Sequence, residues 1–120
     1  MRYTHLNNDS YIVYTPQGMR TITRESINFN KIKKSIQEEA PDEVIAELLK
    51  PTPLTNGIYK AYLFIDTIYL KHISLHGEVT WQDLKGFPIT IYKEFEPKTT
   101  FLGVYTSIDE VIEDWAEYVL

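Results

Sequence analysis

The spacing of apolar residues changes three times along this chain of 120 residues, and these changes restrict its fold more than any other feature. Residues 10–23 are rich in β-branched and aromatic side chains around a proline–glutamine–glycine turn, which predicts a β-hairpin. Residues 29–49 follow the three- and four-residue spacing of helices, residues 58–75 alternate like strands, and residues 108–119 are helical again. Mixed strand and helix segments of this kind predict an α+β fold.

Prolines and capping residues set the bounds of the predicted helices. Asn28 stands at the N-cap position of a helix that Pro41 ends, and a second short helix begins near Asp42. Near the C-terminus, Ser107 and Glu110 form a capping box, in which each side chain satisfies an exposed backbone donor. We therefore expect two short central helices and a C-terminal amphipathic helix.

The strand-like segments predict a mostly antiparallel sheet of about four to five strands. Residues 58–75 form two strands around a tight turn, and residues 87–95 form an edge strand because Pro88 lacks a backbone donor. Residues 80–86 are interpreted as a single helical turn that ends at glycine. The length of the chain predicts a single α+β domain, residues 1–120, with one core.

The residues needed for several kinds of catalysis are missing. The chain has no cysteine, and its five glycines stand singly, which excludes thiolate chemistry and a glycine-rich phosphate loop. His72 and His76 lie about 13 Å apart if they share a strand, and Glu78 and Asp83 join them only if the turn folds back. A histidine general base remains a distant alternative. We predict no catalytic residue, no metal, no cofactor and a protein that is not an enzyme.

The start of the chain is polar, and its longest apolar run covers only residues 61–65. A membrane-spanning helix needs roughly 18 such residues. These features predict a cytoplasmic protein without a signal peptide or a membrane span.

One candidate site combines arginine with aromatic residues. Arg20 and Arg24, together with Trp81, are candidates for binding a small ligand such as a signalling nucleotide, because guanidinium groups bind phosphates and aromatic rings stack on bases. The alternative is that both arginines lie on the solvent side of an amphipathic hairpin.

A second candidate site is acidic. The net charge of −5 is unevenly distributed, since residues 1–34 hold six basic and two acidic side chains, whereas residues 101–120 hold no basic and five acidic ones. Like charges four residues apart on a helix cost a few tenths of a kcal/mol each. The acidic stripe therefore faces a protein partner with a basic surface, faces Lys31, Lys33 and Lys34 within the fold, or keeps the helix solvated. Its members are Asp109, Glu110, Glu113, Asp114 and Glu117.

The order of segments over residues 10–90 resembles part of the phage proteins of the rapid-lysis-inhibition B type. The most similar point is the asparagine–phenylalanine–x–x–isoleucine step at Asn28, Phe29 and Ile32, which follows the hairpin and precedes the second helix. The resemblance implies a phage or mobile-element origin, and so a location in the host cytoplasm. It supplies no catalytic residues.

Two hypotheses follow. The first is a non-enzymatic accessory protein of phage origin that binds and modulates a host macromolecule, such as a defence factor. The second is a small-ligand binding protein that sequesters a signalling nucleotide. An edge strand at residues 87–95 also suggests a homodimer.

Overall fold

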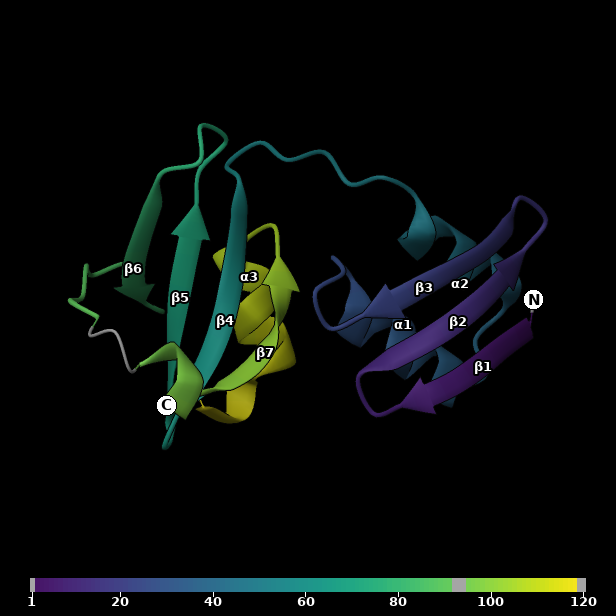
Figure 1. Ribbon diagram of the computed structural model, residues 1–120, viewed down its shortest axis with the longest axis horizontal. Helices are drawn as coiled ribbons and strands as arrows, with labels where there is room; N and C mark the ends of the chain where they lie inside the picture. Colours follow the sequence, from purple (N-terminus) through teal and green to yellow (C-terminus); the bar gives the residue numbers. More distant parts are fainter. Residues whose placement is uncertain (1, 92–94, 119–120) are drawn as a thin grey trace. The chain divides into compact units, whose positions relative to one another are not determined.

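The computed structural model describes residues 2–91 and 95–118, and the chain forms two compact units, Met1–Thr52 and Pro53–Leu120 (Figure 1). We call them unit 1 and unit 2. The predicted α+β class is confirmed, because each unit combines an antiparallel sheet with helices. The expectation of one core is wrong, since the buried apolar side chains form two clusters, one in each unit. Residues 50–57, which include two prolines, form neither helix nor strand and connect the last helix of unit 1 to the first strand of unit 2.

Unit 1 contains a three-stranded sheet in the order β1-β2-β3. The predicted hairpin is confirmed as β2 (Ser10–Thr15) and β3 (Gly18–Thr23). The additional strand, β1 (Arg2–Asn7), pairs antiparallel with β2. Its polar and mostly exposed residues gave no strand signal in the sequence.

Helices α1 (Phe29–Gln37) and α2 (Asp42–Leu49) cover one face of this sheet (Figure 1). Asn28 occupies the predicted N-cap position of α1, but its side chain donates to the Leu48 carbonyl at 3.2 Å and so ties the start of α1 to the end of α2. The core of unit 1 is formed by buried side chains of β2, β3 and both helices: Tyr11, Val13, Ile22, Phe29, Ile32, Ile45 and Leu49.

Unit 2 contains a four-stranded antiparallel sheet in the order β6-β5-β4-β7. Its strands are β4 (Ile58–Phe64), β5 (Thr67–Ile73), β6 (Val79–Asp83) and β7 (Thr100–Tyr105). The described residues thus form seven strands in two sheets, rather than four to five in one.

Two predicted elements of unit 2 are wrong. Most of the expected helical turn at residues 80–86 is strand β6, because Trp81 and its neighbours pair with β5. The expected edge strand at residues 87–95 is reduced to a single bridge between Pro88 and Gln82 over the described part, and residues 92–94 lie outside the described residues. Proline cannot donate to a ladder, which limits pairing at this point.

The C-terminal helix is shorter than its apolar spacing predicts. The Ser107 cap is confirmed, since its hydroxyl accepts a hydrogen bond from the Glu110 backbone N–H at 3.3 Å. However, α3 (Ile108–Asp114) ends at Asp114, and the chain continues in a short 3-10 helix, η2 (Ala116–Tyr118). The last turn of α3 holds acidic residues and no basic one. Its carboxylates therefore lie at the negative end of the helix dipole without a cation beside them on the helix.

The sheet of unit 2 has two different faces. One packs against α3 through a buried cluster that includes Ala61, Leu70 and Val111. The other carries aromatic side chains, and Phe95 lies against the rings of Phe64, Tyr69 and Trp81 with centroid distances of 5.3–5.6 Å. A short 3-10 helix, η1 (Glu96–Lys98), follows Phe95.

Glu96 fixes this segment to the aromatic face. Lys71 Nζ lies 2.8 Å from Glu96 Oε1, and the hydrogen bond from Lys71 holds the pKa of Glu96 below its usual range. Because the pKa is lower in the folded state, the bond contributes stability above the unfolded pKa of about 4.5, and this contribution is lost as the pH falls through the folded value.

We expect Glu96→Gln to lower the stability of unit 2 by less than about 1 kcal/mol at pH 7, since the pair is partly exposed. Urea unfolding followed by tryptophan fluorescence measures the effect, since Trp81 and Trp115 both belong to unit 2. The difference between variant and wild type should disappear in acid, and equal stabilities at neutral pH would contradict the assigned role of the pair.

The turn between β4 and β5 carries local strain. Phe64 pairs with Thr67, so Ile65 and Asp66 form a two-residue turn, and Ile65 has φ 59° although it is β-branched. A left-handed conformation costs such a residue about 1–2 kcal/mol, and asparagine tolerates it better. Ile65 is 83% exposed, so its replacement removes little packing. We expect Ile65→Asn to raise the midpoint of urea unfolding, whereas an unchanged or lower midpoint would argue against strain at this position.

Candidate ligand pocket in unit 1

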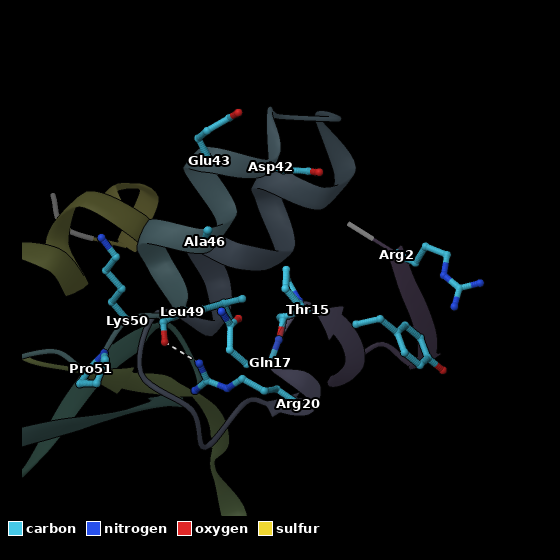
Figure 2. Close-up of a pocket in the computed structure, with 12 residues that line it drawn as sticks. Arg2, Thr15, Gln17, Arg20, Asp42, Glu43, Ala46, Leu49, Lys50 and Pro51 are labelled. Carbon is cyan, nitrogen blue, oxygen red and sulfur yellow. Dashed lines mark hydrogen bonds between the residues drawn. The ribbon is translucent and has the colours of Figure 1, made fainter.

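Unit 1 contains a pocket of about 860 Å³ between the β2–β3 turn and helix α2 (Figure 2). Ligand pockets usually measure about 300–1,000 Å³ and combine apolar walls with a few polar groups. This one is lined by Arg2, Tyr14, Thr15, Pro16, Gln17, Arg20, Asp42, Glu43, Ala46, Leu49, Lys50 and Pro51. Its size and mixed chemistry suit a small organic molecule.

Arg20 reaches from β3 to the end of α2. It stands two residues before the buried Ile22 on the strand, so both side chains project to the face that the helices cover. Its Nη1 donates to the Leu49 carbonyl at 2.6 Å, as Figure 2 shows. This bond satisfies a carbonyl of the last helical turn and holds the guanidinium in the pocket wall.

The turn that forms the other wall is also fixed by hydrogen bonds. The Thr15 hydroxyl donates to the Gly18 carbonyl at 2.9 Å and accepts from the Gln17 backbone N–H at 3.2 Å. Gln17 is exposed at the tip of this turn, and its side chain lies near Arg20 in Figure 2. Two neighbouring hydrogen-bonding side chains therefore come from a rigid hairpin.

The remaining lining groups carry both charges. Arg2 lies over the Tyr14 ring, with 5.4 Å from its guanidinium carbon to the ring centroid. Asp42 and Glu43 stand in the first turn of α2, where acids are stabilised by the helix dipole. Lys50 forms an ion pair with Glu47 at 2.8 Å. Because the pair is well exposed, the anion of a ligand can readily replace Glu47 beside Lys50.

The structure does not bring the three predicted ligand residues together. Arg24 lies outside the pocket: its Nη2 is 2.8 Å from Asp9 Oδ1, and its guanidinium carbon lies 5.1 Å from the centroid of the Phe29 ring. Trp81 belongs to unit 2, where its ring packs against Tyr62. Of the three predicted residues, only Arg20 lines the pocket.

The polar residues that sequence reasoning missed come from two places. Gln17 belongs to the turn that was recognised, and Asp42 and Glu43 to the helix that was recognised. No local pattern shows that these segments meet, because the contact from Arg20 to Leu49 spans 29 residues. Only the long-range packing of hairpin on helix creates the pocket.

The five C-terminal acids do not form one uniform stripe. Glu110 accepts a hydrogen bond from the Thr106 hydroxyl at 2.7 Å, and Asp114 accepts one from the Tyr105 hydroxyl at 2.9 Å. Trp115 completes the second network by donating to the Tyr105 oxygen at 2.8 Å. The other three acids, Asp109, Glu113 and Glu117, are exposed. Those three are the acids of the predicted partner site that face solvent.

The histidines take part in local contacts. His72 Nε2 lies 2.6 Å from the Asn56 carbonyl, and the His72 ring stacks on Tyr59, whereas His76 is exposed in the turn after β5. Across residues 2–91 and 95–118, no group of three or more histidine, aspartate or glutamate side chains is arranged to hold a metal ion. The helices of this described part are also too short and too polar to cross a membrane.

No protein-family model matches the chain, and no curated protein or solved structure shows significant similarity to it. The phage resemblance of residues 10–90 therefore stays a prediction.

Proposed function

We propose that this chain is a binding protein whose unit 1 pocket holds a small ligand with an aromatic ring and an anionic group, the combination found in nucleotides. The observation that carries the proposal is Arg20, because its guanidinium is fixed in the wall of a pocket of suitable size. A guanidinium has five N–H donors, and the bond to the Leu49 carbonyl uses only one of them.

The pocket offers a partner for each part of such a ligand. Arg20 and the neighbouring Gln17 suit a phosphate or carboxylate, since charge-assisted hydrogen bonds are the stronger ones. The apolar surface of Ala46 and Leu49 suits the ring, and the carboxylates of Asp42 and Glu43 can accept hydrogen bonds from amino groups on a base.

A thermal-shift panel of nucleoside mono- and diphosphates, with inorganic phosphate as reference, tests this function. A ligand at 100 times its dissociation constant stabilises its unit by about 2.7 kcal/mol, which raises the melting temperature of so small a unit by roughly 10–20 °C. We expect at least one nucleotide to produce such a shift. The absence of any shift across the panel would contradict the proposal.

Arg20→Ala should abolish the shift, but it also removes the bond to α2. Gln17→Ala provides the matched variant, since Gln17 is exposed and its backbone hydrogen bond is retained. If Arg20 has only a structural role, Arg20→Ala lowers the melting temperature while the nucleotide shift persists. If the pocket binds the ligand, both variants weaken the shift.

A second function, binding of a protein partner with a basic surface, is favoured by the unequal charge of the two units. Unit 1 has seven basic and seven acidic side chains, whereas unit 2 has five basic and ten acidic ones. Together with the resemblance to phage proteins, this charge supports an accessory protein that binds a host macromolecule. Reversal of the exposed acids Glu113 and Glu117 should weaken capture of such a partner without unfolding unit 2, and retained capture would count against the acidic C-terminal region as the contact.

A further inference from the structure

Unit 2 contains a hollow of its own, a groove of about 740 Å³. Three segments that are distant in sequence form it: the β4–β5 turn with the start of β5, the turn after β6, and the C-terminal helical region. The lining residues are Asp66, Thr67, Ile68, Asp83, Leu84, Lys85, Ile112, Glu117 and Tyr118.

The floor of this groove is apolar and belongs to the core. Its accessible apolar surface comes from the half-buried Leu84 and Tyr118, which pack against the buried cluster that contains Ile68. Ile112 of α3 adds a half-buried apolar side chain. Because these residues are held by the core, the floor is formed before any partner arrives.

The rim of the groove carries a surplus of negative charge. Asp66, Asp83 and Glu117 stand on it with a single lysine, Lys85. Asp83 is held in place because its Oδ1 accepts hydrogen bonds from the backbone N–H groups of Lys85 and Phe87, each at 2.9 Å. Among the described residues, none of these three carboxylates forms an ion pair within 4.0 Å.

We propose that this groove binds a short segment of a protein partner in which leucine or isoleucine alternates with lysine or arginine. The apolar side chains would cover the floor, and the cations would meet the carboxylates of the rim. The charge complementarity excludes nucleic acid as the occupant, and the acidic surplus of unit 2 as a whole steers a basic segment toward it. The proposal rests on the second function above and narrows its contact to the groove, which Glu117 of the acidic C-terminal set lines.

Two double variants with the same loss of charge test the location. Asp66→Asn with Glu117→Gln changes the groove, whereas Asp109→Asn with Glu113→Gln changes exposed acids of α3 that do not line it. The probe is a short lysine–leucine peptide, titrated by calorimetry and by amide chemical shifts into the full chain. A lysine–serine peptide of equal charge tests the apolar floor.

We expect the groove variant to weaken binding of the lysine–leucine peptide about tenfold and the α3 variant to change it less than about twofold. The lysine–serine peptide should bind more weakly than the lysine–leucine peptide. Equal weakening by both variants would overturn the groove as the binding site while retaining a basic partner. No binding of either peptide would contradict the groove and the second function together. A doubled molecular mass that the groove variant abolishes would assign the groove to a second copy of this chain and overturn a foreign partner.

Discussion

Gly57→Ala is expected to destabilise unit 2 by about 3–5 kcal/mol, because two separate costs act at this position. Gly57 has φ +80°, a conformation that is strained for alanine. It is also buried, and an added Cβ would collide with the carbonyl oxygen of Ile73 and the Cα of Ser74. Both neighbours are backbone, so a side-chain rotation cannot relieve the collision. A unit of this size has a total stability of only several kcal/mol, at about 0.1 kcal/mol per residue.

Gly77→Ala is the matched control for this variant. Gly77 lies in the same unit with nearly the same φ, +84°, but an added Cβ would meet no atom within 4 Å. It therefore reports backbone strain alone, about 1–2 kcal/mol. Urea unfolding followed by the amide signals of β4 and β5 measures both variants. If Gly57→Ala costs no more than Gly77→Ala, the close approach of Gly57 to the end of β5 is wrong.

Phe29→Ala is expected to remove about 3–5 kcal/mol from unit 1, since large-to-small changes of buried phenylalanine leave a cavity. The Phe29 side chain is 2% exposed and lies beneath Tyr11, with 6.2 Å between the ring centroids, and beneath the Arg24 guanidinium. The variant therefore removes contacts between α1 and the sheet. We expect the dispersed amide signals of unit 1 to disappear at a clearly lower urea concentration in the variant than in the wild type.

Met19→Ala is the control in the same unit. Met19 lies on β3 and is 68% exposed, so its truncation should change stability by less than about 0.5 kcal/mol. The signals of β5 serve as an internal reference, because the core of unit 2 is a separate cluster. A small effect of Phe29→Ala would contradict the assigned core of unit 1.

Local patterns predicted the elements that depend on neighbouring residues. The β2–β3 hairpin, the two central helices and the Ser107 cap follow from turn residues, helical spacing and capping chemistry. The same reasoning missed β1, because an exposed edge strand needs little apolar character. It also missed β7, which the sequence separates from its partner β4 by the whole of β5 and β6.

The candidate site was predicted only in part, for the same physical reason. Arg20 was singled out by its chemistry, and the structure places it in a pocket. Trp81 was associated with it by residue type alone, yet it belongs to the other unit, and Arg24 is engaged with Asp9. Composition identifies which groups can bind a ligand, whereas long-range packing decides which of them meet.

An amide NMR titration of the full chain, with the nucleotide that gives the largest thermal shift, tests whether unit 1 alone holds the ligand. We expect chemical-shift changes at Gln17, Arg20 and the residues of α2, with the Trp81 indole signal unchanged. Changes centred on the Trp81 indole, or no changes in either unit at saturating nucleotide, would contradict binding by unit 1 alone.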